Sequence, residues 1–173
     1  PAASPAVGAA SARPAAGDAA AGRAETAPTA QAAGDQGAPG FTANLLGGGT
    51  FTLSAQRGKP VLVLFTASWC SDCIPEIGKM AQLQQEFGAR GLRQLVLSVD
   101  PSDTEKQFAG FRQKTSGANL LWALDPGQKA TLAYRVQATD TKVLVDPRGQ
   151  VAFRTMGSTS LETLRQHISP FFS

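Results

Sequence analysis

Residues 61–73 read VLVLFTASWCSDC, a strand-like run of apolar side chains that leads directly into two cysteines. Consecutive apolar residues at 61–65 predict a strand that is buried on both faces. After Cys73, apolar side chains recur at helical spacing as far as Phe87, so a helix follows the strand. This order places Cys70 at or beside the helix N-terminus, where unpaired backbone N–H groups and the helix dipole favour a negative charge. We therefore expect Cys70 to be the more readily ionised thiol.

Cys73 is expected about one turn further along the helix, close enough to form a disulfide with Cys70 and more deeply buried. The predicted pair is an exposed nucleophile and a sheltered resolving thiol. These are the only cysteines, which excludes a disulfide framework and a four-thiolate zinc site within one chain. A structural disulfide, or half of a metal site shared between chains, remains as an alternative. Redox chemistry is favoured over both, because so short a disulfide loop constrains the unfolded chain very little.

Several further segments accompany the cysteines. They are APGFT at 38–42, TLS at 52–54, RGKPVLVLF at 57–65, ASWCSDC at 67–73 and VLVDPRG at 143–149. With these landmarks the chain from residue 38 onward resembles the TlpA/ResA-like thiol-disulfide oxidoreductases of the thioredoxin superfamily. The resemblance implies a periplasmic or otherwise extracytoplasmic domain that exchanges electrons with protein dithiols and disulfides, for example in cytochrome c maturation or copper-centre assembly. It implies no bound cofactor, because the disulfide Cys70–Cys73 itself carries the electrons.

The remaining pattern predicts an α/β domain over residues 38–173. Strands are expected at 41–46, 50–53, 61–65, 92–99, 120–124, 142–145 and 151–155, and helices from the cysteines to 87, from about 102 to 114, at 128–134 and from about 159 to 168. The glycines at 47–49 predict an N-terminal β-hairpin. Capping boxes are predicted at 102–105 and 159–162. This order gives a thioredoxin-like fold with a mixed central sheet flanked by helices and an added N-terminal β-hairpin.

Residues 1–37 are rich in Ala, Pro and Gly and contain almost no large apolar side chain. Such a segment cannot bury enough surface to fold, so it is predicted to be a disordered tether. A linker that holds the domain off a membrane and a passive tail are both compatible with it. The sequence contains no run of eighteen apolar residues, so no membrane span is predicted. Because the chain starts at Pro1, we expect that a leader or anchor of unknown type preceded it.

Charge does not indicate a polyanion partner. The formal net charge is +3, from 16 Lys and Arg residues and 13 Asp and Glu residues. The basic residues are scattered among acidic ones and do not alternate with aromatic residues, as a single-stranded nucleic-acid site would require. No nucleic-acid partner is therefore predicted.

Two carboxylates lie close to the cysteines in sequence. Asp72 opposes ionisation of Cys70, which predicts a moderately acidified thiol and a pair that acts as a reductant. The alternative is that Asp72 points into solvent and matters little. Glu76 occupies the position at which the resemblance implies an acid that tunes the cysteines and relays a proton. A partly buried Glu76 with a raised pKa could relay this proton. Alternatively, Glu76 only interacts favourably with the helix dipole, which requires no raised pKa.

The substrate side is predicted from Trp69 and from a loop that lacks proline. The indole of Trp69 is expected to be partly exposed and to contact a docking protein. In thioredoxin-like domains a cis-proline normally precedes the strand that here reads KVLV at 142–145. Counting back from Asp146 places Asp140 at that position, after Thr139, and 136–141 contains no proline. We expect a trans peptide, since a cis bond without proline costs roughly 3 kcal/mol, and a reshaped loop in which Thr139 and Asp140 contact the substrate.

A second departure from the resemblance is Pro75, which should kink the helix or delay its start. Two other functions compete with disulfide exchange. The reduced cysteines could bind Cu(I) as a module for metal-centre assembly, although the only histidine, His167, is expected on the surface of the last helix. A peroxiredoxin is disfavoured because Ala67 stands where that chemistry requires threonine.

Overall fold

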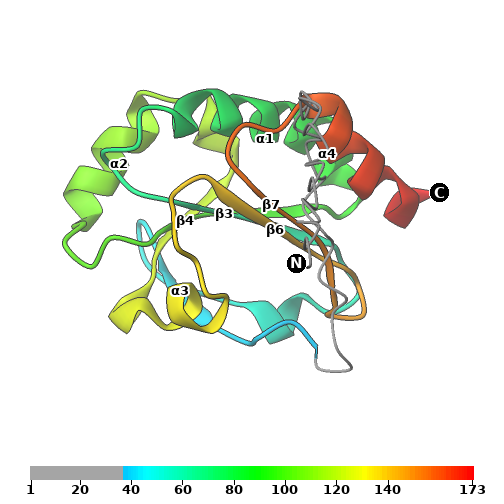
Figure 1. The fold of residues 1–173 in the computed structure, drawn as a ribbon, viewed down its shortest axis with the longest axis horizontal. Coiled ribbons are helices and arrows are strands. Elements are labelled where there is room, and N and C mark those ends of the chain that lie inside the picture. The colour runs from blue at the N-terminus through cyan, green and yellow to red at the C-terminus, as the bar shows by residue number, and fades with distance from the viewer. Residues whose placement is uncertain (1–36) are drawn as a thin grey trace, which may run out of the picture.

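The computed structural model describes residues 37–173, which form one seven-stranded mixed sheet flanked by helices (Figure 1). The predicted tether, with its proposed membrane attachment, lies outside the described residues apart from Gly37. Among the described residues, no helix combines the length and apolar character needed to cross a bilayer.

The elements follow the predicted order. The strands are β1 (Thr42–Leu45), β2 (Thr50–Thr52), β3 (Val61–Thr66), β4 (Arg93–Ser98), β5 (Leu121–Leu124), β6 (Thr141–Val145) and β7 (Val151–Met156). The α-helices are α1 (Cys73–Phe87), α2 (Glu105–Gln113), α3 (Lys129–Ala133) and α4 (Leu161–Ile168). The sheet order is β2-β1-β5-β4-β3-β6-β7, in which β3, β4 and β5 are parallel and the remaining pairs are antiparallel. The predicted thioredoxin-like fold is confirmed.

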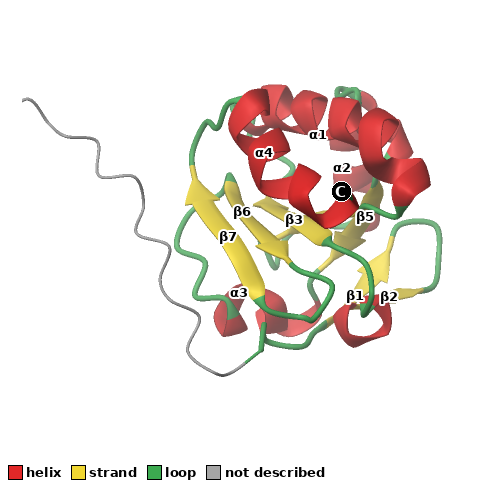
Figure 2. Ribbon diagram, turned by 90° about the vertical axis from the view of Figure 1, so that its right-hand side faces the viewer, coloured by secondary structure: helices red, strands yellow, loops and turns green. Residues whose placement is uncertain are grey.

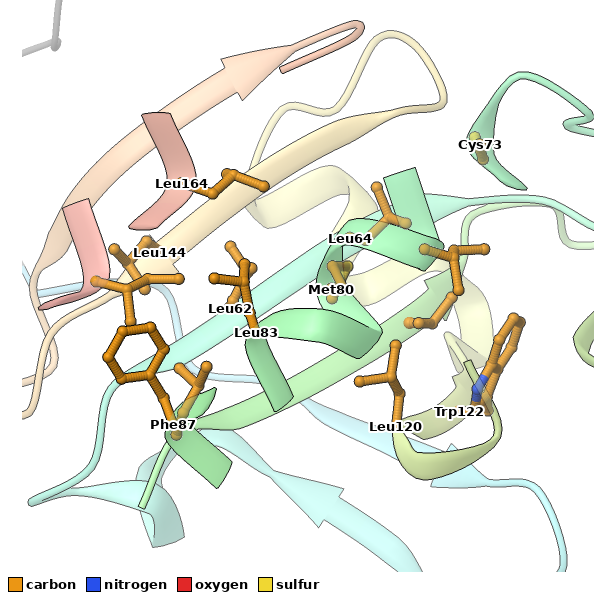
Figure 3. Packing of buried hydrophobic residues seen from close by; sticks show 14 of the residues in the cluster. Leu62, Leu64, Cys73, Met80, Leu83, Phe87, Leu120, Trp122, Leu144 and Leu164 are labelled. Carbon is orange, nitrogen blue, oxygen red and sulfur yellow. The ribbon is translucent and has the colours of Figure 1, made fainter. Parts of the chain in front are cut away.

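Strand β3 is the centre of the sheet, and all six of its residues are buried. It pairs with β4 on one side and β6 on the other, and helices cover both faces. In Figure 2, α1, α2 and α4 lie over one face and α3 over the other. Leu62 and Leu64 point into the core beneath α1, part of which is drawn in Figure 3, whereas Val63 and Phe65 point into the core on the opposite face. The active-site segment therefore leaves from the most completely buried strand.

The N-terminal hairpin is formed by β1 and β2, as the glycine turn predicted. Gly47, Gly48 and Gly49 all adopt positive φ, which side chains disfavour. Strand β1 also pairs with β5, so the hairpin extends the sheet at the edge away from β6.

The predicted helix starts need correction. Helix α2 begins after Thr104, which forms a capping box with Gln107, so the predicted box at 102–105 is misplaced. Helix α4 is capped by Ser160, whose hydroxyl accepts a hydrogen bond from the Thr163 N–H, instead of by the box at 159–162. Pro75 lies in the first turn of α1, where a backbone N–H has no intrahelical acceptor. It is therefore compatible with a helix that starts at Cys73.

Candidate active site

Cys70 and Cys73 form a disulfide in the turn between β3 and α1, with their Cα atoms 5.4 Å apart. The Cys70 N–H donates to the Ala67 carbonyl, and the Cys73 N–H donates to the Cys70 carbonyl. Cys73 is the first residue of α1, so Cys70 lies in the turn before the helix. Cys70 therefore lies beside the helix N-terminus, as predicted, whereas Cys73 was expected about one turn further along the helix and is instead its first residue.

The two sulfur-bearing residues differ in exposure in the predicted direction. Cys73 is fully buried, whereas Cys70 is 6% exposed, which is less than expected of an exposed nucleophile. Cys70 nevertheless lines a surface groove. The groove is lined by Trp69, Cys70, Ser71, Asp72, Pro75, Thr139, Asp140, Gly157 and Ser158. A partner sulfur therefore has access to Cys70, and its access to Cys73 is blocked.

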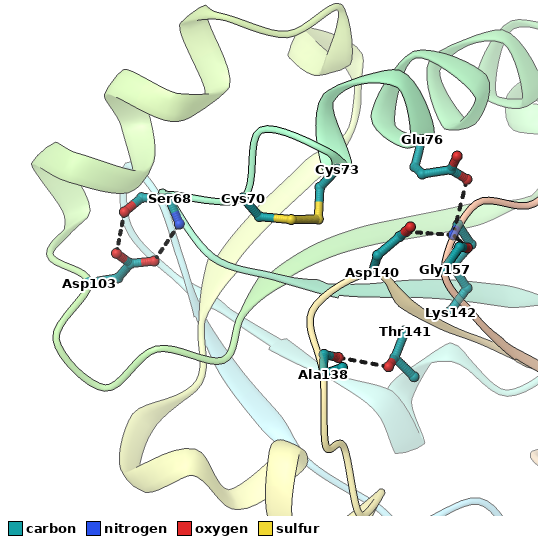
Figure 4. The surroundings of a disulfide bond; sticks show 10 residues. All are labelled: Ser68, Cys70, Cys73, Glu76, Asp103, Ala138, Asp140, Thr141, Lys142 and Gly157. Atoms are coloured by element: carbon teal, nitrogen blue, oxygen red, sulfur yellow. Dashed lines mark hydrogen bonds and ion pairs between the residues drawn. A yellow bond between two sulfur atoms is a disulfide. The ribbon is translucent and has the colours of Figure 1, made fainter.

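The segment before Cys70 is attached to the loop after β4. The Trp69 side chain is 65% exposed, as predicted, and its indole N–H donates to an Asp100 carboxylate oxygen at 2.8 Å. The Ser68 N–H and hydroxyl donate to the two oxygens of Asp103 (Figure 4). The Asp103 carboxylate also accepts from the Ser98 hydroxyl. Sequence reasoning assigned Asp103 to a helix cap and missed this role. The only available signal was that Asp103 follows a strand parallel to β3. The carboxyl ends of these two strands lie at the same edge of the sheet.

The loop opposite the disulfide has the predicted trans geometry, since the described residues contain no cis peptide. Asp140 adopts φ 63°, an unusual conformation for a residue with a side chain. Its N–H donates to the Phe65 carbonyl at 2.8 Å, and its carbonyl accepts from the Gly157 N–H at 2.9 Å. Asp140 and the half-buried Thr139 both line the groove. The structure thus places these predicted substrate contacts beside Cys70.

Glu76 is buried on the first turn of α1, and its carboxylate has several donors. It lies 2.5 Å from Lys79 Nζ and 3.0 Å from Lys142 Nζ, and it accepts from the Ser158 hydroxyl and the Thr159 N–H. Burial raises the pKa of Glu76, but the hydrogen bonds from Lys79 and Lys142 and the charge of Lys142 outweigh burial. The pKa of Glu76 is therefore lowered, and the predicted raised pKa is wrong. In Figure 4 its carboxylate points toward Lys142.

Lys142 was missed as a site residue. Its side chain is 0% exposed, and its ammonium lies between Glu76 and Asp140, 2.6 Å from the Asp140 carboxylate. Burial raises the pKa of Asp140 above its ordinary value, although Lys142 opposes this rise. The available signal was a lysine one residue before the apolar run Val143–Val145, in a strand predicted to pair inside the sheet.

Asp72 and His167 have little contact with this cluster. Asp72 is the exposed N-terminal cap residue of α1, and its side chain makes no capping hydrogen bond. Its side chain is exposed and lines the groove beside Cys70, so its effect on that thiol stays a prediction. His167 is exposed on α4 and stacks on Phe153. No group of three or more His, Cys, Asp or Glu side chains suited to a metal ion occurs within residues 37–173.

A disulfide between cysteines three positions apart, in the turn after a buried central strand of this fold, defines a thioredoxin-like thiol-disulfide oxidoreductase. Residues 34–154 match the family described as AhpC/TSA, and the chain belongs to that family. It is 29% identical over 131 residues to the thiol-disulfide oxidoreductase ResA of Bacillus thuringiensis (strain Al Hakam), covering 76% of this chain and 74% of the relative. ResA of Geobacillus thermodenitrificans (strain NG80-2) is 29% identical over 144 residues, covering 83% and 80%. The predicted resemblance is confirmed.

Solved structures agree with this assignment. A crystal structure of a putative thiol:disulfide interchange protein DsbE from Chlorobium tepidum superposes with a TM-score of 0.72 at 26% identity, covering 80% of this chain and 96% of that one. The thioredoxin domain of a thiol-disulfide oxidoreductase from Bacteroides vulgatus gives a TM-score of 0.68 at 22% identity, covering 77% and 96%, and supports the fold alone.

Proposed function

We propose that this thiol-disulfide oxidoreductase works outside the cytoplasm as a reductant of protein disulfides. The observation that carries the direction of electron flow is the placement of Cys70 in the turn before α1, with exposed Asp72 between the two cysteines. A thiolate is stabilised most at the helix N-terminus itself and is destabilised by a nearby carboxylate. A less stable thiolate favours the disulfide form, so the reduced protein readily gives up its electrons.

The reaction proceeds in two exchanges. The Cys70 thiolate attacks one sulfur of the partner disulfide, forms a mixed disulfide and releases the other partner sulfur as a thiolate. The Cys73 thiolate then attacks the Cys70 sulfur, which closes the Cys70–Cys73 disulfide and releases the second partner thiolate. Two electrons pass to the partner, and its two thiolates take up the protons that Cys70 and Cys73 lost.

Cys73 must lose its proton where water has little access. Glu76, one turn further along α1, is the proposed proton acceptor or electrostatic tuner for this step. Its lowered pKa makes it a weaker base than the sequence suggested, although it is charged at neutral pH. Trp69, Thr139 and Asp140 are proposed to contact the partner polypeptide, because they line the groove on either side of Cys70.

The location rests on the resemblance to TlpA/ResA-like domains, and it predicts partners such as those of cytochrome c maturation. It is tested by producing the full natural gene product in bacteria and digesting intact spheroplasts with protease. Digestion without lysis supports an extracytoplasmic site, and protection until lysis contradicts it.

The direction is tested by equilibrating the protein with glutathione buffers and measuring the Cys70–Cys73 reduction potential. We expect a value far below the roughly −120 mV of the strong oxidant DsbA and closer to the roughly −270 mV of thioredoxin. A value near or above that of DsbA contradicts the reductant role. Titrating the reduced protein with Cu(I) against a colorimetric chelator tests the copper alternative, which requires tight binding of one ion by the cysteine pair.

A further inference from the structure

The ammonium of Lys142 is the point at which three parts of the active site meet. Its Nζ atom lies 3.0 Å from Glu76 Oε2 and 2.6 Å from Asp140 Oδ1, and it donates to the Gly157 carbonyl at 2.9 Å. An ammonium has three protons, so these three acceptors satisfy it completely. None of its hydrogen-bonding capacity is left for water, which agrees with a side chain that is 0% exposed.

The charges around Lys142 balance. Helix α1 contributes Glu76 and the partly exposed Lys79, and the loop before β6 contributes Asp140. The loop 157–159 contributes only backbone and hydroxyl groups. Within the sheet, the neighbours opposite Lys142 are the uncharged Leu64 of β3 and Thr155 of β7. Two carboxylates therefore face two ammonium groups, and removing either buried partner leaves an uncompensated charge in a poorly hydrated site.

Each acceptor belongs to an element that carries part of the groove. Glu76 is on the helix that begins with Cys73, Asp140 is in one groove-lining segment, and Gly157 is in another. Asp140 also adopts a left-handed backbone, which has an energetic cost for a residue with a Cβ atom. The bond from Lys142 to its carboxylate opposes this cost. A lysine two residues after Asp140 thus connects the helix of the resolving cysteine to both segments that lie beside the groove.

We propose that Lys142 is a positioning residue for disulfide exchange: its buried ammonium fixes the segments at Thr139–Asp140 and Gly157–Ser158 relative to the disulfide and holds Glu76 and Asp140 as carboxylates. In this loop without proline, an ion cluster sets the shape of the groove. The inference rests on exchange through Cys70 and Cys73, but not on the direction of electron flow or on the cellular location.

Loss of this ammonium has a distinctive consequence. Without Lys142, the nearest remaining cation is Lys79, which pairs with Glu76 and leaves the Asp140 carboxylate without its ion pair, so one of these two buried carboxyl groups takes up a proton more readily. The carboxyl group takes up and releases this proton close to the buried Cys73. The pH dependence of the disulfide-exchange rate should therefore show an additional ionisation. A role limited to packing lowers the stability of the protein and leaves the pH profile unchanged.

The test compares Lys142→Met with wild type and with Lys106→Met, which removes the same charge from an exposed position on α2. For each folded protein, the rate of exchange with a protein disulfide and with glutathione disulfide is measured from pH 5 to 9. We expect Lys142→Met to show an additional ionisation in this range and at least a tenfold slower reaction with the protein disulfide. Lys106→Met should match wild type. Adding Glu76→Gln and Asp140→Asn to Lys142→Met should abolish the additional ionisation while the reaction remains slow.

Lys142→Gln is measured in parallel, because it retains a donor for the Gly157 carbonyl and keeps the fold if methionine does not. The proposal is overturned if a folded Lys142→Met or Lys142→Gln protein has the wild-type rate and pH profile. It is also overturned if both fail to fold while the triple variant folds and reacts at the wild-type rate. A high reduction potential in these proteins would contradict the reductant role and leave this inference intact.

Discussion

The two sides of the disulfide are built differently. On the Cys70 side, Trp69 and Ser68 are attached to Asp100 and Asp103 by hydrogen bonds between loops near the surface. Beyond Cys73 on α1, Glu76 belongs to a cluster of charges from which water is largely excluded. Figure 4 shows the contacts between Ser68 and Asp103 on one side of the disulfide and the cluster around Lys142 on the other. The difference is consistent with the proposed functions, in which the Cys70 side contacts the partner and the Cys73 side sets the environment of the resolving thiol.

The largest expected effect comes from replacing the cysteines singly. Cys70→Ser and Cys73→Ser should each abolish turnover, because one thiol cannot complete the two exchanges. Cys73→Ser should accumulate a mixed disulfide with a protein substrate, and Cys70→Ser should accumulate little, since Cys73 is buried. Non-reducing gel electrophoresis measures both. Equal accumulation of the mixed disulfide by the two variants would contradict the assignment of Cys70 as the attacking thiol and Cys73 as the resolving thiol.

The second effect concerns the buried cluster. Glu76→Gln should lower the free energy of unfolding at pH 7 by about 3 kcal/mol, because it leaves the ammonium groups of Lys79 and Lys142 with Asp140 as the one remaining carboxylate of the cluster. The pKa of Glu76 is lower in the folded than in the unfolded chain, so its contribution is complete above the ordinary value of 4.5 and is lost as pH falls through the folded-state value. The difference between wild type and variant should therefore shrink below about pH 4.5.

Urea unfolding at a series of pH values measures this difference. Glu86→Gln is the matched control, since Glu86 pairs with Arg165 on the surface and should cost no more than about 1 kcal/mol. A Glu76→Gln effect that stays constant down to pH 3 would show that the carboxylate charge is not the source of the stabilisation.

The third effect is on the Cys70 side. Asp103→Asn should destabilise the protein by about 2 kcal/mol, because the carboxylate accepts three hydrogen bonds from Ser68 and Ser98 and the amide can accept only part of them. Asp72→Asn, at an exposed site without a capping bond, should stay within about 0.5 kcal/mol of wild type. Thermal unfolding compares the two. Equal stabilities would mean that the Asp103 network does not anchor the Cys70 segment.

The smallest effect on stability is expected at Trp69. Trp69→Ala should leave the free energy of unfolding almost unchanged, since the side chain is largely exposed, and should slow exchange with a protein disulfide several-fold. Exchange with glutathione disulfide should be unaffected. Leu132→Ala, another exposed apolar residue on α3, should change neither rate. Equal slowing with both disulfides would show that Trp69 acts on Cys70 and not on the partner.

The sequence was sufficient for the fold because its strongest signals are local. The apolar run at 61–65, the cysteine spacing and the glycines at 47–49 each specify an element without reference to distant residues. Helix starts were less certain, because Ser102 and Thr104 both offer a hydroxyl and only packing chooses between them. The disulfide and the exposure of Trp69 followed from the same local order, whereas Asp140 was located from the resemblance to thioredoxin-like domains.

The electrostatics could not be predicted in this way. The spacing placed Glu76 correctly, but its pKa depends on Lys142, which lies 66 positions later in the chain and reaches it only through the pairing of β3 with β6. Burial alone implied a raised pKa, and the buried cation reversed the sign. Asp103 illustrates the same limit, since its contact with Ser68 spans two parallel strands.

The central claim is that Cys70 presents the attacking sulfur and Cys73 lies behind it. The most direct test is to reduce the native protein, expose it to a brief pulse of iodoacetamide at pH 7 and locate the label by peptide mass spectrometry. Labelling should fall on Cys70 first, with Cys73 modified only after unfolding. Preferential or equal labelling of Cys73 in the folded protein would contradict the account.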